Sequence, residues 1–180
     1  MATFYDHITE KQAEFITRQP MFFTATACKE GRINLSPKGM DSFRVLNKNE
    51  CAYLDLSGSG NETAAHLKHD GRITLMFNSY DRNPLILRLY GHGRAVQRGQ
   101  DEFESLLALF PSYAGTRQII VIKVDSTQDS CGFAVPVMDL VETRQTLVKF
   151  SESKGEDGMV EYRQQKNKIS IDGLDTGLLD

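Results

Sequence analysis

The first candidate for a functional site is the segment Ile33-Asn34-Leu35-Ser36-Pro37-Lys38-Gly39, a predicted strand in which polar side chains alternate with others. Alternate side chains of a strand face opposite sides, so Asn34, Ser36 and Lys38 share one face. We expect Ile33 and Leu35 to face the core. Two neutral hydrogen-bonding groups followed by an ammonium suit a ligand that carries hydroxyls and a terminal phosphate. An ordinary polar strand face ending in a Pro-Lys-Gly turn explains the same residues, and the run alone favours that simpler interpretation.

A second candidate is the segment Ser57-Gly58-Ser59-Gly60-Asn61-Glu62-Thr63. It follows a predicted strand and leads into a predicted helix over residues 61–69. A flexible Gly/Ser loop at a helix N-terminus offers backbone N–H groups and the positive end of the helix dipole. Ser59, Asn61 and Thr63 add side-chain donors, although plain N-capping would use the same residue types. The two runs together indicate a phosphate site better than either does alone.

Arg88 is the third candidate, because it interrupts an apolar strand, Leu85-Ile86-Leu87-Arg88-Leu89-Tyr90. The leucines share one face of that strand, and Arg88 lies on the other between Ile86 and Tyr90. A charge in so apolar a strand is usually paired or lies at an interface. The alternative is that Arg88 faces an anionic ligand, and the sequence favours neither interpretation.

These residues need a scaffold, and the surrounding pattern predicts mostly antiparallel β structure. Expected strands lie at residues 21–28, 32–37, 43–46, 51–56, 72–79, 85–96 and 118–125, and expected helices at 9–19, 61–69 and 101–110. Short strands joined by hairpins predict a barrel or sandwich with helices packed at its ends. The tail differs: residues 143–153 and 156–168 are charged and helical in propensity, and Gly155 separates them. We interpret the tail as an appendage or as an arm that contacts a partner subunit.

Length and composition restrict the class of protein. The chain has 180 residues and a formal charge of −3, from 21 Lys and Arg against 24 Asp and Glu. This predicts one folded domain and disfavours nucleic acid as a partner, because such binding needs many cations. We find no secretory signal and no run long enough to span a bilayer. Cys28, Cys51 and Cys131 are expected to be buried reduced thiols of a cytoplasmic protein, and His66 and His69 are expected at the surface rather than on a metal.

Three segments, in this order, resemble the pyridoxamine 5′-phosphate oxidase-like, FMN-binding split-barrel family: FFTATACKEGRINLSPKG, AYLDLSGSGNETAAHLKHDGRITLMF and LILRLYGHGRAV. The tail, with CGFAVPVMDLV and KGEDGMVEYRQQKNKISIDGL, is similar to that of a subgroup known only by the family name. The resemblance implies a mainly β fold, a six-stranded antiparallel split β-barrel with peripheral helices and a helical C-terminal arm. It also implies a homodimer that holds FMN between its subunits. The single domain would comprise an N-terminal helix (1–20), the barrel (21–125) and a C-terminal extension (126–180).

The resemblance also implies roles for individual residues. The run at 34–38 would meet the ribityl chain, phosphate or ring edge, the loop at 57–63 would bind the phosphate, and Arg88 would reach the flavin of the partner subunit. The predicted cofactor-binding residues are Asn34, Leu35, Ser36, Pro37, Lys38, Ser57, Ser59, Gly60, Asn61, Thr63 and Arg88.

Two departures from the family pattern bear on function. The loop is less basic than is usual, and Glu62 would repel a phosphate if it pointed inward. The chain also contains no Trp and no counterpart of the Arg motif that contacts the B6 substrate, which argues against oxidation of that vitamin.

We therefore expect an FMN-dependent oxidoreductase that acts on an unknown small molecule. No catalytic residue stands out, and Tyr53, Tyr90 and His92 are interpreted as structural. The alternatives are a non-catalytic protein that stores or senses flavin, a haem- or deazaflavin-binding split barrel, and an interaction module without a cofactor.

Overall fold

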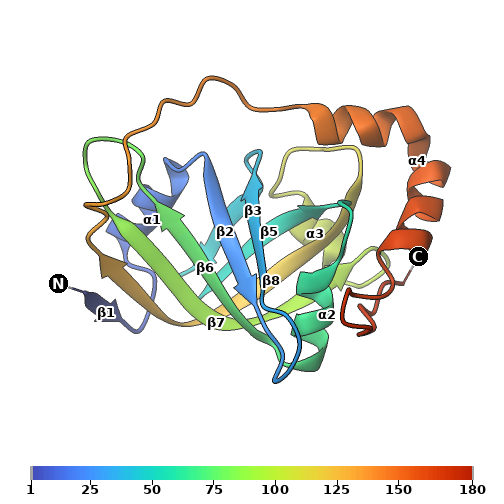
Figure 1. Cartoon of the computed structure of the whole chain (residues 1–180), viewed down its shortest axis with the longest axis horizontal. Coiled ribbons are helices and arrows are strands. Elements are labelled where there is room, and N and C mark those ends of the chain that lie inside the picture. The colour runs from blue at the N-terminus through green and yellow to red at the C-terminus, as the bar shows by residue number, and fades with distance from the viewer. Residues whose placement is uncertain (1, 180) are drawn as a thin grey trace.

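A strongly curled antiparallel sheet with helices around its margin makes up most of the molecule (Figure 1). The computed structural model describes residues 2–179. Its helices are α1 (Glu10–Thr17), α2 (Glu62–His69), α3 (Phe103–Leu107) and α4 (Thr146–Lys166). The expected helices are all present, with bounds a few residues shorter than the sequence predicted.

Eight strands build the sheet, rather than the six of the predicted barrel. They are β1 (Thr3–Tyr5), β2 (Met21–Thr26), β3 (Asn34–Gly39), β4 (Phe43–Asn47), β5 (Glu50–Leu56), β6 (Arg72–Asn78), β7 (Ile86–Gln97) and β8 (Thr116–Ser130). The order is β3-β2-β6-β7-β8-β5-β4, and β1 pairs with the end of β8. The fold is an antiparallel split barrel, as expected. The sequence missed β1 because three mostly exposed residues carry no alternating pattern.

Local signals in the sequence set the bounds of two helices. The N-terminus of α1 is a capping box, in which the Gln12 amide donates to Thr9 Oγ1 at 3.2 Å and the Thr9 amide donates to Gln12 Oε1 at 3.0 Å. In α4, Gly155 has φ 69° and interrupts the helical backbone. The break predicted between the two charged tail segments is therefore present as a kink in one helix.

The two longest strands, β7 and β8, form the back of the barrel and pair from Ile86–Ser130 to Gln97–Gln118. Their register shifts between Tyr90 and Gly91. A Cβ on Gly91 would lie 2.0 Å from the carbonyl oxygen of Lys123, so only glycine fits at this bulge. The irregularity bends the ladder and helps the sheet to curl.

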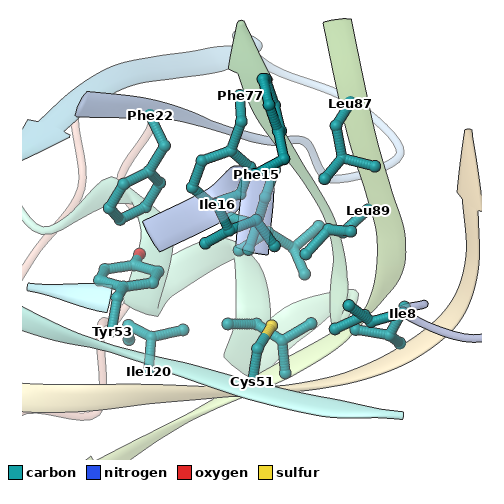
Figure 2. Packing of buried hydrophobic residues seen from close by; sticks show 14 of the residues in the cluster. Ile8, Phe15, Ile16, Phe22, Cys51, Tyr53, Phe77, Leu87, Leu89 and Ile120 are labelled. Atoms are coloured by element: carbon teal, nitrogen blue, oxygen red, sulfur yellow. The ribbon is translucent and has the colours of Figure 1, made fainter. Parts of the chain in front are cut away.

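The core fills the inside of the curl (Figure 2). Leu87 and Leu89 point inward from β7 and are almost fully buried. Phe22 stacks on Phe77 with ring centroids 5.3 Å apart and meets the Tyr53 ring edge-on at 5.6 Å. Helix α1 closes one end of the barrel with apolar side chains. The opposite face of β5 and β8 is also packed, because Ala52, Leu54, Ile119 and Val121 form a second buried cluster with Phe103 of α3.

After β8 the chain leaves the barrel as an irregular strap over residues 131–145, which crosses to α4 (Figure 1). Met138 donates its amide to the carbonyl of Tyr80, while Phe133 and Val141 are 82% and 93% exposed. The strap begins with Cys131, which is exposed, and Cys28 is only partly buried, so of the three thiols that were expected to be buried only Cys51 is. Among the helices of residues 2–179, none is both long and apolar enough to cross a membrane.

Candidate functional site

A cavity of about 250 Å³ lies between the edge strand β3 and the N-terminus of α2. Strand β3 contributes alternate side chains, β5 contributes its last residues, and the loop to α2 and the start of β8 close the remaining sides. The lining consists of Asn34, Ser36, Lys38, Asp55, Leu56, Gly58, Ser59, Gly60, Asn61, Glu62, Thr63 and Arg117. The structure thus brings the two polar runs of the sequence together.

The face that β3 turns inward is the polar one. Asn34, Ser36 and Lys38 line the cavity, whereas Ile33 and Leu35 are 77% and 65% exposed. The expectation that these two apolar side chains face the core was wrong. Period-2 alternation shows which residues share a face, but not which face is inside. At this sheet edge the inner face meets the loop before α2 instead of the apolar core.

A buried carboxylate holds two cations at the base of the cavity. Asp55 is 2% exposed, and its Oδ1 accepts from Lys38 Nζ at 2.8 Å. Arg117 donates to Asp55 Oδ2 through Nη2 at 2.7 Å and through Nε at 3.1 Å, and its Nη1 donates to the carbonyl of Gly60 at 2.9 Å. The ion pair also ties β3 to β5, which are not neighbours in the sheet.

The charge balance of this cluster favours an anion. Burial alone would raise the pKa of the Asp55 carboxyl, but Arg117 and Lys38 hold that pKa below its ordinary value through their charges and hydrogen bonds. One carboxylate and two cations leave a net charge of about +1. Lys38 has three N–H donors and Arg117 has five, so each keeps two beyond the bonds described.

A network of amide and hydroxyl groups forms the wall above these charges. Asn34 Nδ2 donates to Thr26 Oγ1 at 3.1 Å and to Thr63 Oγ1 at 3.0 Å, and Ser36 Oγ donates to Asn34 Oδ1 at 3.0 Å. His66 Nδ1 lies 3.0 Å from Thr26 Oγ1. His66 is 2% exposed, so its expected surface position was wrong. It supports the wall from behind.

The loop before α2 uses its side chains differently from the prediction. Asn61 stands at the N-cap position without a capping bond; its Oδ1 instead accepts from Gln118 Nε2 at 2.8 Å. Ser57 is fully buried and lies outside the cavity lining. Ser59 and Gly60 line the cavity as expected. Glu62 also lines the cavity, but its two carboxylate oxygens accept from the Ile171 amide at 3.1 and 3.2 Å. Its negative charge is therefore directed toward the C-terminal segment.

Three buried oxygens around this loop have no hydrogen-bond partner among the described residues. They are Ser57 Oγ, Gln118 Oε1 and Asn167 Oδ1. Buried polar atoms are normally satisfied by protein, water or ligand. None of these three residues lines the cavity, so their oxygens do not by themselves indicate a ligand there.

The remaining predicted site residues lie elsewhere. Leu35 and Pro37 are exposed and do not line the cavity. Arg88 lies on the outer face of the sheet, between Met76 and Gln128 of the neighbouring strands, and donates to Ser130 Oγ at 3.0 Å. Within one chain, Arg88 therefore does not join the cavity, and its predicted contact with a cofactor requires a second subunit.

Sequence reasoning missed Arg117 and Asp55. Arg117 lies two residues before the apolar run Ile119-Ile120-Val121-Ile122, and Asp55 interrupts a buried strand in Ala52-Tyr53-Leu54-Asp55-Leu56. The signal that singled out Arg88, a charge within apolar sequence, applies to Asp55, whereas Arg117 lies between Thr116 and Gln118 and shows no such signal. Of the residues interpreted as structural, Tyr53 is fully buried, and burial raises the pKa of its phenol.

A larger cavity of about 620 Å³ lies under α1, lined by apolar side chains that include Phe22, Phe43 and Phe77. None of the predicted site residues lines it. Its one arginine, Arg44, is held by both carboxylate oxygens of Asp41. We therefore assign the anion-binding chemistry to the smaller cavity, where cations keep free donors.

Comparison with known proteins agrees with the fold and the resemblance. The family model described as pyridoxamine 5′-phosphate oxidase matches residues 8–131. The chain belongs to this family. A pyridoxamine 5′-phosphate oxidase family protein of Aspergillus flavus, ustO, is 37% identical to it, over 97% of this chain and 77% of the relative.

Solved structures agree at the level of the fold. A structure from Lactobacillus delbrueckii, described as a possible pyridoxamine 5′-phosphate oxidase, superposes with a TM-score of 0.55 at 18% identity, over 68% of this chain and 94% of the other. A FAD-binding protein of Mycobacterium smegmatis superposes with a TM-score of 0.51 at 10% identity, over 69% and 96%. The split barrel is therefore common to proteins of very different sequence.

Proposed function

We propose that the protein is an FMN-binding oxidoreductase that acts on a small molecule other than the B6 vitamers, and that the cavity beside Lys38 receives the cofactor's phosphate. The observation that carries the proposal is the pair of cations, Lys38 and Arg117, fixed by Asp55 with donors to spare. Membership of the family supports it, as does the FAD-binding protein that shares the fold.

The residues fit a phosphate and the adjoining sugar chain rather than an entire flavin. The cavity is smaller than the roughly 300 Å³ at which pockets for drug-sized ligands begin. The Lys38–Asp55–Arg117 cluster has a net charge of about +1, which matches a phosphate group, and the carboxylate of Glu62, which also lines the cavity, accepts from the Ile171 amide. The ring would therefore lie beyond the cavity, against surfaces that include those supplied by a second subunit.

When bound, the flavin supplies hydride transfer to or from its ring, and the chain supplies binding and electrostatics. Lys38 and Arg117 would neutralise the phosphate through their remaining N–H groups. Asp55 would keep both cations in place and limit the excess charge. Ser36, whose proton is directed to Asn34, would accept a hydrogen bond from a ribityl hydroxyl.

We further propose a homodimer formed through the outer face of the sheet. Leu35 of β3 and Ile33 just before it are exposed, and Arg88 lies on the outer face of β7. A partner that covers this face would bury the apolar side chains and bring its own Arg88 toward the bound flavin. Sedimentation velocity should give a dimer for the natural protein and a monomer for Leu35→Glu. A natural protein that sediments as a monomer would contradict the dimer.

The free thiols Cys28, Cys51 and Cys131 are consistent with a proposed cytoplasmic location.

The absorption spectrum of the purified protein tests the cofactor. A flavin spectrum, with FMN released on denaturation, supports the proposal. A deazaflavin spectrum or a Soret band would identify the alternatives, and a colourless protein that rejects added FMN would rule the proposal out. Haem needs an axial ligand, and neither His nor Cys lines the cavity.

Titration with FMN tests the phosphate position. Lys38→Ala should weaken binding about ten-fold or more, since a charge-assisted hydrogen bond contributes about 1.5–3 kcal/mol. The matched control is Lys123→Ala, which removes the same charge from an exposed position on β8. Equal affinities for the two variants would mean that the phosphate lies elsewhere. Reduction of the bound flavin by a panel of reductants then separates an enzyme from a storage protein.

A further inference from the structure

The chain beyond α4 returns to the cavity instead of extending away from the barrel, and Figure 1 shows it beside α2. Residues 167–176, here called the C-terminal hook, begin at Asn167, which is fully buried. Asn167 Nδ2 donates to the carbonyl of Gly58 at 3.1 Å. The carbonyl of Asn167 accepts from Asn61 Nδ2 at 3.4 Å and from Thr176 Oγ1 at 2.7 Å. Asn167 therefore contacts both ends of the loop 58–61.

A second contact joins the hook to the first turn of α2. The Ile171 amide donates to both carboxylate oxygens of Glu62, at 3.1 and 3.2 Å. Glu62 is the acidic residue that would oppose a phosphate in the cavity. Because its oxygens are occupied by the hook, its charge is partly compensated from the far side.

Further bonds attach the hook, and the residues that follow it, to other parts of the barrel. Asp172 accepts from the Arg32 amide just before β3 at 2.6 Å, and Asp175 pairs with Lys68 of α2. Beyond the hook, Gln97 of β7 donates to the carbonyl of Gly177 and accepts from the Leu179 amide, both at 2.8 Å. The hook therefore bonds to α2 and to the segment that leads into β3, the two elements between which the cavity lies.

We propose that the C-terminal hook holds the loop 58–61 in the conformation that receives the phosphate, with Asn167 as the positioning residue. This rests on the proposed function. Gly58 and Gly60 give the loop high backbone freedom, and a Cβ at Gly58 would meet nothing within 4 Å, so packing does not restrict the loop at Gly58. Arg117 and Gln118 bond its other end, at Gly60 and Asn61. Ordering such a loop opposes ligand binding, and a prior attachment removes that cost. Docking of the hook and binding of the phosphate then strengthen each other equally.

The first test uses the protein without cofactor, so it does not depend on the proposed function. Asn167→Ala should raise hydrogen exchange of amides 57–63 while exchange in β7 and β8 stays unchanged. The control Lys68→Ala breaks only an exposed attachment of the hook and should leave the exchange of 57–63 as it is. Unchanged exchange in Asn167→Ala would overturn the hook's role. If that variant does not fold, Thr176→Val removes the bond to the Asn167 carbonyl and should act in the same direction.

The second test measures the coupling with FMN. Asn167→Ala should weaken FMN binding about ten-fold, the loss of roughly one hydrogen bond, and Lys68→Ala less than about two-fold. By reciprocity, saturating FMN should slow tryptic cleavage after Lys168 in the natural protein. Normal affinity in a variant whose loop exchanges faster would overturn the coupling. A natural protein that rejects FMN would instead overturn the proposed function, and the exchange result would still decide whether the hook holds the loop.

Discussion

Two charged residues interrupt apolar strands of this barrel, and the structure uses them in opposite ways. Asp55 of β5 is 2% exposed and accepts from Lys38, Arg117 and Gln118. Arg88 of β7 lies on the outer face and has one described hydrogen bond, to Ser130. A charge that points inward must be fully paired because burial removes its water, whereas a charge on an outer face needs only solvent or a partner subunit. The sequence signal is the same, and the side of the sheet decides its meaning.

The largest expected difference between the two residues is in stability. Asp55→Ala should lower the free energy of unfolding by about 3–5 kcal/mol, because it leaves Lys38 and buried Arg117 without their counter-charge. Arg88→Ala should cost less than about 1 kcal/mol in the monomer. Urea denaturation of both variants measures the difference. Comparable losses would show that Arg88 is also part of the folded core.

The cofactor provides the next contrast. Arg117→Lys keeps the charge but loses the planar fork that bonds Asp55 and Gly60, so we expect FMN affinity to fall about ten-fold. Arg88→Lys, which keeps a flexible cation on the outer face, should change affinity less than about three-fold. Fluorescence titration measures both. A larger effect at Arg88 would place the main phosphate contact on the dimer interface.

Acid pH separates the two residues further. The pKa of Asp55 is below its ordinary value in the folded protein, so its contribution to stability is complete above about pH 4, the unfolded value, and is lost as the pH falls toward the folded pKa. The stability of Asp55→Asn should therefore depend less on pH below about 4 than that of the natural protein. Arg88→Ala should keep the pH dependence of stability that the natural protein has. Denaturation curves collected between acid and neutral pH measure how the free energy of unfolding depends on pH. The same pH dependence in all three proteins would contradict the lowered pKa of Asp55.

The smallest effect is expected at the partner of Arg88. Ser130→Ala removes that one hydrogen bond on a partly exposed face and should change stability by less than about 0.5 kcal/mol. Gln118→Ala removes a fully buried donor to Asp55 and Asn61 and should cost about 1–3 kcal/mol. Thermal unfolding of the two variants compares how much a hydrogen bond on the outer face and one at the buried Asp55 contribute to stability. A large loss in Ser130→Ala would show that the outer face is packed more tightly than its exposure indicates.

The sequence by itself determined the local features of this protein. The capping box at Thr9, the break at Gly155 and the shared face of Asn34, Ser36 and Lys38 are all present, because each depends on residues within one or two turns or a single strand. The antiparallel split barrel and the family also followed from the order of the segments. Much of the candidate cavity could be named in this way.

Only the tertiary structure decided how these parts face one another. It turned the polar side of β3 inward and left Leu35 exposed, added Asp55 and Arg117 to the cavity, and brought Asn167 to the loop at Gly58. These residues are separated by tens of positions in the chain, and no local period relates them. Which side of an edge strand is inside depends on what the curled sheet and the returning C-terminus place across from it, and that is a property of the whole fold.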